Sequence, residues 1–246
     1  MRTLAPPRPD AAGAADAGPV PATVPAAPGA GRTALVACGA LAREVRDLAG
    51  RRGWDVDLHA LPAFLHMAPP RIVAELDRLL ERLRGRGGRA VVVYGDCGTA
   101  GAIDRVLARH GAERVAGPHC YEMFGGDELA RLLADRPGTF LLTDWLVANF
   151  DLAVVRGLGL DRHPELREVY FAHYTGVLYL AQDPTPEREA AAARAAAYLG
   201  LPLEIWDRGL GDLEERLTEL VERGPAPPGR CTETTPEFAT AVGCTP

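Results

Sequence analysis

Short, continuous runs of apolar residues alternate with longer amphipathic stretches between residues 33 and 223. The apolar runs include TALVAC, RAVVVYG, TFLLT and TGVLYLAQ, and the longest amphipathic stretch, residues 69–88, has proline in its first turn and glycine at its end. Strands without polar alternation are buried on both faces, which is typical of parallel sheets covered by helices. The sequence therefore predicts an α/β fold with a doubly wound, mainly parallel, Rossmann-like sheet and helices on both faces.

Glycine and proline residues mark where the predicted strands and helices begin and end. We expect strands at residues 33–38, 54–61, 89–95, 112–117, 139–143, 175–182 and 203–209. We expect helices at residues 40–53, 69–88, 99–111, 126–138, 185–200 and 210–223, with a further helix starting at residue 144 and a helical region at 163–174.

The two ends of the chain differ from the middle. Residues 1–32 are rich in Ala, Pro and Gly, and residues 224–246 have a similar composition. Segments that bury so little apolar surface cannot offset the entropy lost on ordering, so we predict that both are disordered. Residues 33–223 are then expected to form a single α/β domain.

Charge and hydropathy exclude several classes of protein. The net charge of −6 gives no basic surface for nucleic acid or for an anionic membrane. No apolar run approaches the roughly 20 residues of a membrane-spanning helix, and the N-terminus has no secretory signal. We therefore predict a cytoplasmic protein, in which five cysteines are thiols, metal ligands or catalysts rather than a disulfide framework.

Thiols and imidazoles follow the predicted strands at the points where those strands end. Cys38 ends the first strand, His66 follows the second, Cys97 follows the third, and His119 and Cys120 follow the fourth. In an open parallel sheet, ligands bind beyond the carboxyl ends of the strands. We therefore expect these side chains to meet at one edge of the sheet.

Three thiolates and one imidazole are a normal ligand set for zinc. Three cysteines can instead hold an iron–sulfur cluster and leave one iron open to substrate. We predict a metal site with Cys38, Cys97, Cys120 and His119 as ligands, occupied by zinc or by an iron–sulfur cluster. The remaining thiols, Cys231 and Cys244, lie in the tail and are not expected to take part.

The titratable residues near these thiols suggest catalysis on a small-molecule substrate. His66 or His119 would act as an acid or base, or as the fourth ligand. Glu122 and Asp144 are predicted to orient an imidazole through hydrogen bonds. A catalytic metal would keep one coordination position open for water, thiol or substrate.

Glycines flank the first two thiols. Gly39 follows Cys38, and Gly95 and Gly98 surround Cys97. We expect these glycines to lie at the cofactor, since glycine allows sharp turns and a close backbone approach. YGDCGTAG matches neither the GxGxxG nor the GxxxxGK[ST] fingerprint, which argues against nucleotide binding.

Three alternatives to a catalytic metal site stay open. In the first, the cysteines are small buried hydrophobic residues, the usual role of a lone cysteine. In the second, the protein is a non-catalytic metal carrier or assembly accessory with an exchangeable site. In the third, it is a metal-free transferase in which Cys97 is the nucleophile and His119 or His66 is the base, and a helix N-terminus lowers the pKa of the Cys97 thiol.

The chain resembles the uncharacterised family called domain of unknown function 1638 in the residues of several segments and in their order. These segments are CGAL, LHMAPP, YGDCG, HCYEMFGG, PGTFLLTDWL and FAHYTGVLYLAQ. The resemblance spans roughly residues 33–220. It implies that Cys38, His66, Cys97, His119, Cys120 and Glu122 belong to family motifs. Because members occur near genes for corrinoid methyltransferases, it also implies a setting in one-carbon or corrinoid-linked metabolism, but it implies no particular reaction.

Overall fold

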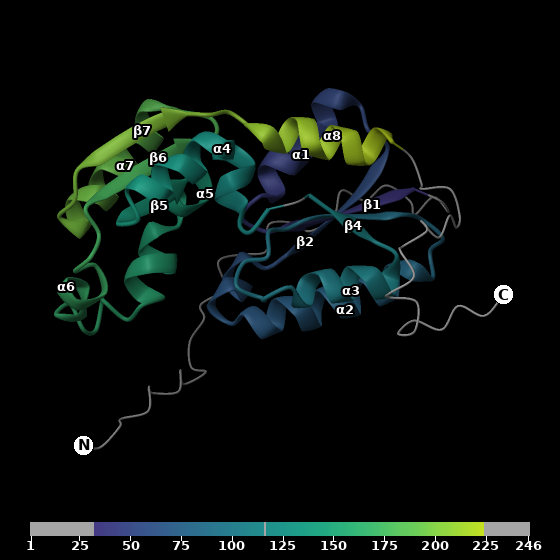
Figure 1. The fold of residues 1–246 in the computed structure, drawn as a ribbon, viewed down its shortest axis with the longest axis horizontal. Helices are drawn as coiled ribbons and strands as arrows, with labels where there is room; N and C mark the ends of the chain where they lie inside the picture. The colour runs from purple at the N-terminus through teal and green to yellow at the C-terminus, as the bar shows by residue number, and fades with distance from the viewer. Residues whose placement is uncertain (1–31, 116, 224–246) are drawn as a thin grey trace, which may run out of the picture.

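The computed structural model describes residues 32–115 and 117–223 (Figure 1). The predictions of disorder for residues 1–32 and 224–246, and those for Cys231 and Cys244, concern segments that lie outside the described residues, apart from Arg32. No helix in the described part is long and apolar enough to cross a membrane.

Strands and helices alternate along the chain as predicted. The strands are β1 (Thr33–Cys38), β2 (Val56–Leu61), β3 (Ala90–Val93), β4 (Glu113–Arg114), β5 (Thr139–Thr143), β6 (Gly176–Ala181) and β7 (Leu203–Asp207). The α-helices are α1 (Ala42–Arg52), α2 (Pro69–Arg84), α3 (Ala102–His110), α4 (Cys120–Asp135), α5 (Asp144–Ala148), α6 (Leu166–Tyr170), α7 (Pro186–Leu199) and α8 (Asp212–Glu222). A 3-10 helix, η1 (Ala63–Met67), and a π-helix, η2 (Asp151–Arg156), complete the described elements.

All strand pairs in the described residues are parallel, which confirms the α/β class. The strands are divided between two sheets, one in the order β2-β1-β3-β4 and the other in the order β5-β6-β7. In the first sheet the chain leaves β1 toward β2 on one side and returns to β3 on the other. The ends of β1 and β3 therefore flank a topological switch point, where α/β sheets bind their ligands.

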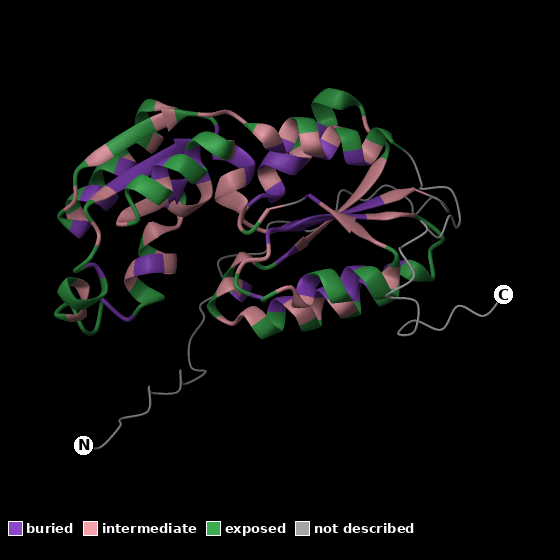
Figure 2. Ribbon diagram, viewed as in Figure 1, coloured by how far each residue is buried: buried purple, intermediate pink, exposed green. Residues whose placement is uncertain are grey.

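Helices cover both faces of the first sheet, with α1 and α8 on one side and α2 and α3 on the other (Figure 1). The chain comes back from β7 through α8, which packs beside α4 and against β3. Figure 2 shows buried residues in the central strands of both sheets. One core cluster contains β1 and β3 residues together with Leu178 and Leu180 of β6, so apolar packing is continuous from one sheet to the other.

Candidate functional site

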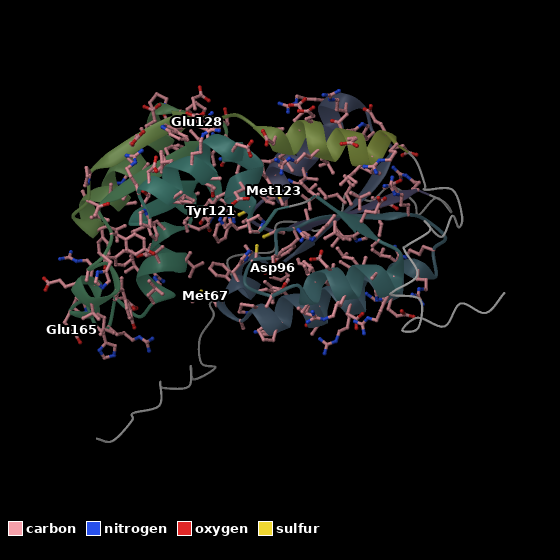
Figure 3. The ribbon with its side chains drawn as sticks, viewed as in Figure 1. Met67, Asp96, Tyr121, Met123, Glu128 and Glu165 are labelled. Carbon is pink, nitrogen blue, oxygen red and sulfur yellow. The ribbon has the colours of Figure 1, made fainter. Side chains whose placement is uncertain are left out.

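The three cysteines come from the carboxyl edge of the first sheet. Cys38 is the last residue of β1, Cys97 follows β3, and Cys120 begins α4 after β4. All three are free thiols, and Cys97 and Cys120 pack against the core cluster that contains Cys38. The charge of Cys97 would raise the pKa of both Cys38 and Cys120, and the charge of Cys38 would raise that of Cys120. In Figure 3 sulfur atoms gather in the middle of the molecule, near the labelled Asp96 and Tyr121.

Burial controls the protonation of these thiols. Cys38 is 1 % exposed, and burial raises its pKa to about 12, although the Ala40 N–H donates to its sulfur over 3.4 Å. Burial also raises the pKa of Cys97 and, together with repulsion from the other two sulfurs, that of Cys120. The cost of removing a thiolate from water outweighs the stabilisation that a helix N-terminus gives it, so all three thiols are neutral at pH 7.

The loop that carries Cys97 is held in an unusual backbone conformation. Cys97 has a φ of 48°, in the left-handed region that non-glycine residues rarely adopt. Its N–H donates to Pro118 O over 2.9 Å, and the N–H of Asp96 donates to Gly117 O over 3.2 Å. These bonds continue the β3–β4 pairing and bring the start of α4 to Cys97. Strained residues of this kind concentrate at functional sites.

The glycines beside the thiols permit close approach between backbone segments, whereas their place at a cofactor stays a prediction. A Cβ on Gly95 would lie 2.5 Å from the Cα of His119, and one on Gly39 would lie 2.8 Å from Leu61 O. Only glycine therefore allows the loops after β2 and β4 to reach the cysteine loops. Gly98 has a φ of 81° and lies near Pro69.

His66 is held in one orientation. Its Nδ1 lies 2.6 Å from Ala63 O, and its ring stacks on Tyr94 with centroids 5.5 Å apart. Because a backbone carbonyl only accepts, Nδ1 carries a proton, and in the neutral tautomer Nε2 would then hold the lone pair. His66 also lines the cavity described below, so its Nε2 suits the predicted role of base or ligand.

His119 precedes α4 and lies near Glu122, but without the hydrogen bond that was predicted between them. Its Nε2 lies 3.8 Å from Glu122 Oε1, which is an ion-pair distance rather than a hydrogen bond. Its Nδ1 is buried without a hydrogen-bond partner among the described residues. The ring also contacts Tyr121 edge to face, with centroids 5.6 Å apart.

A cavity of about 230 Å³ lies beside the thiols. The first sheet contributes His66, Cys97, His119 and Cys120 to its wall, and the second contributes residues that follow β5. The carboxyl ends of the two sheets therefore face each other across this cavity, which we call the thiol pocket. Most of the remaining wall is apolar or aromatic, and its members are Ala40, Ala63, Phe64, Met67, Tyr121, Thr143, Trp145 and Leu146.

Tyr94 follows β3 and is fully buried at the thiols. The charges of Cys38, Cys97 and Cys120 all act on its hydroxyl and raise its pKa, with burial as the largest cause. That hydroxyl interacts with the Cys38 thiol, although the contact falls short of full hydrogen-bond geometry.

The side chains do not form a ready-made metal centre. Within residues 32–115 and 117–223, no group of three or more His, Cys, Asp or Glu side chains is arranged to hold a metal ion. The thiols lie near one another, but they would have to move to coordinate one atom together.

Asp144 lies apart from the imidazoles. It begins α5 and is 3 % exposed, and its carboxylate accepts from the Tyr179 hydroxyl over 2.7 Å and from Arg43 over 2.7 Å. Thr143 caps α5 by accepting from the N–H of Leu146. Within the described residues, neither histidine of the thiol pocket is a hydrogen-bond partner of Asp144, so its predicted contact with an imidazole is absent there.

Residues 60–217 match the family described as "Protein of unknown function (DUF1638)". The chain belongs to the DUF1638 family. The match covers more than half of the chain and includes His66, Cys97, His119, Cys120 and Glu122, whereas Cys38 precedes it. No curated protein and no solved structure matches the chain. Family membership therefore carries no reaction over to this protein.

Several residues of the site have no signal in the sequence. Phe64 and Trp145 contact edge to face across the thiol pocket, with centroids 5.6 Å apart. Arg43 sits in an ordinary amphipathic helix, and nothing in its surroundings in the sequence points to Asp144, 101 residues away. Only the contact between the two sheets makes these residues neighbours.

Proposed function

We propose that this DUF1638 protein binds a metal ion or a small iron–sulfur cluster through the thiols of Cys38, Cys97 and Cys120, with His119 as a fourth donor. The observation that carries the proposal is that three free thiols from separate elements meet beside the buried Tyr94 hydroxyl, at the carboxyl edge of the first sheet. A metal-bound thiolate is a better acceptor than a neutral thiol, so binding would strengthen the contact between that hydroxyl and the Cys38 sulfur.

Binding has to be coupled to deprotonation and to a movement of the side chains. The thiols are neutral in the protein as it stands, because burial raises each pKa. A cation reverses this balance by stabilising thiolates, and its uptake releases their protons. Cys97 lies in a loop and Cys120 is the first residue of α4, and both residues are half-buried, so their side chains have more freedom to adjust than that of Cys38.

The thiol pocket supports a site that also receives a small substrate. It has room for a small molecule next to Cys97 and Cys120, and His66, which also lines it, is a candidate base. A non-catalytic carrier needs no such cavity, so this arrangement favours the catalytic reading. One-carbon or corrinoid-linked metabolism in the cytoplasm, where thiols stay reduced, is the setting that we propose.

The metal-free transferase is the weaker alternative. A nucleophilic cysteine reacts as its thiolate and sits where the pKa is lowered. The pKa of Cys97 is instead raised, with burial as the largest cause, as are those of Cys38 and Cys120.

Metal analysis and visible spectroscopy of the full chain, purified without oxygen, test the proposal. Broad visible absorption with stoichiometric iron would identify a cluster, and a colourless protein with one zinc would identify a zinc site. C38S, C97S and C120S should each lose the metal, and the matched variant C231S should keep it. Wild-type protein without metal after reconstitution, or retention by all three variants, would refute the proposal.

A further inference from the structure

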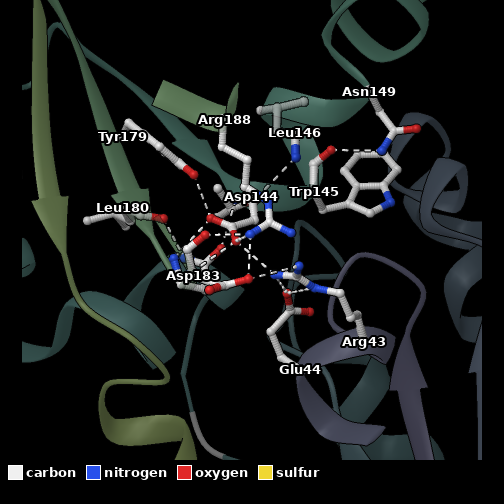
Figure 4. A network of polar contacts seen from close by, with 12 residues as sticks. Arg43, Glu44, Asp144, Trp145, Leu146, Asn149, Tyr179, Leu180, Asp183 and Arg188 are labelled. Carbon is white, nitrogen blue, oxygen red and sulfur yellow. Dashed lines mark hydrogen bonds and ion pairs between the residues drawn. The ribbon is translucent and has the colours of Figure 1, made fainter. Parts of the chain in front are cut away.

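A second cavity, of about 260 Å³, lies beside the thiol pocket. Its charged wall comes from Arg43 and Glu44 on α1, Asp144 on α5 and Arg188 on α7. It shares two wall residues, Ala40 and Trp145, with the thiol pocket. The sequence singled out two of its wall residues, Asp144 and Gly39, but not the two arginines, whose guanidinium groups lie at the junction of the sheets (Figure 4).

Asp144 is a fixed anion that positions one of these guanidinium groups. Its Oδ1 accepts from the Tyr179 hydroxyl over 2.7 Å and from the N–H of Gln182 over 3.0 Å. Its Oδ2 accepts from Arg43 over 2.7 Å and from the N–H of Asp183 over 3.1 Å. With both oxygens satisfied by buried or half-buried donors, Asp144 orients Arg43 and is not free to bind a ligand.

Asp183 occupies the space between the two arginines. Its Oδ2 lies 2.5 Å from Arg188 Nη1 and 3.8 Å from Arg43 Nη1. The side chain is 66 % exposed, so it lies at the rim of the cavity and can turn into solvent. An exposed ion pair contributes only about 0–1 kcal/mol, so an incoming carboxylate can replace this one at little cost.

The charges of the cavity favour a ligand with a single negative charge. With Asp183 turned away, Arg43 and Arg188 face the buried carboxylates of Asp144 and Glu44. A monoanionic carboxylate then meets two cations in the geometry that guanidinium forks prefer. A phosphate dianion would add a second negative charge beside two buried carboxylates.

We propose that this cavity binds the carboxylate group of a small carboxylic acid, held by Arg43 and Arg188 in the place that the Asp183 side chain takes. Because the cavity shares Ala40 and Trp145 with the thiol pocket, the other end of the acid points toward Cys97. This orientation, unlike the carboxylate site itself, rests on the proposed function.

Calorimetric titration of the full chain with propionate and with inorganic phosphate, at constant ionic strength and pH 7, tests the carboxylate site. Wild-type protein should bind propionate more tightly than phosphate. D183N should bind propionate several-fold more tightly, because the competing carboxylate is gone. R188Q should lose about tenfold or more in affinity, the usual effect of removing a charged hydrogen-bond donor, and R78Q, an exposed arginine on α2, should match the wild type.

The carboxylate site is refuted if neither wild type nor D183N binds propionate, if phosphate binds more tightly, or if R188Q binds like wild type. C97S should lose metal but keep propionate binding. Propionate binding by a wild-type protein that takes up no metal would refute the proposed function and leave the carboxylate site standing. Butyrate should slow alkylation of Cys97 in wild type but not in R188Q, and equal alkylation rates with and without butyrate would refute the orientation.

Discussion

Replacing Gly95 by alanine should destabilise the protein by forcing apart the loops that carry Cys97 and His119. The added methyl carbon would lie 2.5, 2.8 and 2.9 Å from the Cα, C and N atoms of His119, all of them backbone. Carbon atoms make favourable contacts at about 3.5–4.0 Å, so the His119 backbone has to move by roughly 1 Å. Overpacking of this kind costs about 1–3 kcal/mol, and each kcal/mol lowers the Tm of a chain this long by roughly 2–4 °C.

Urea unfolding of the full chain measures the effect, and G50A is the matched control. Gly50 lies in the exposed part of α1, and a Cβ there meets nothing within 4 Å. The same substitution should therefore stabilise the protein by about 0.5–1 kcal/mol, because alanine favours helix. If G95A unfolds at the same urea concentration as the wild type, then the tight packing of Gly95 on His119 is wrong, and with it the reason for a glycine at that position.

The remaining predictions concern protonation and the junction of the sheets. Cys38, with a pKa raised to about 12 by burial, should be alkylated more than a hundredfold more slowly at pH 8 than in unfolded chain, and more slowly than Cys97, as measured by site-resolved mass spectrometry; equal rates would contradict its burial. D144N should lower the free energy of unfolding by roughly 3 kcal/mol, the lower end of the cost of breaking a buried ion pair, and an unchanged urea midpoint would contradict that role. The hydrogen bond with His110 lowers the pKa of the Asp77 carboxyl in the folded protein. The stability that this bond contributes is fully present above the pKa of Asp77 in the unfolded chain, about 3.9. It is lost as the pH falls through the lower pKa of the folded state. D77N should therefore flatten the acid limb of stability against pH, measured as urea midpoints from pH 6 to pH 3, and an equally steep limb would rule this out.

The sequence predicted the elements better than their assembly. Six of the seven strands lie within a few residues of their predicted ranges, because continuous apolar runs mark buried strands directly. The predicted strand at 112–117 is reduced to Glu113–Arg114 at the edge of the first sheet. Periodicity also does not specify which strands pair, so the division into two sheets was not foreseen. The chain passes from one sheet to the next through α4, which has a break at Gly126.

The sequence predicted the position of those site residues whose place follows from the fold alone. His66, Cys97, His119 and Cys120 all line one cavity because parallel strands deliver their following loops to the same edge. The protonation of the thiols was not predictable from helix starts, because burial in the assembled junction dominates the pKa of Cys38. The contact between Phe64 and Trp145 and the ion pair between Arg43 and Asp144 likewise join residues that are far apart in the sequence.

The thiol pocket lies between the carboxyl edges of the two sheets, so its shape depends on how the sheets are joined. The thiols belong to the first sheet, and the opposite wall follows β5 of the second. Asp144 lies between two residues of that wall, Thr143 and Trp145, and it is tied to α1 of the first sheet by its ion pair with Arg43. The Asp144 side chain is 3 % exposed and that of Arg43 is 38 % exposed, so the pair is buried on the Asp144 side alone. Because a hydrogen bond weakens steeply as its geometry departs from the ideal, we expect the pair to help hold the two walls of the pocket together, and a ligand that alters the Arg43 contacts to affect the thiol pocket as well.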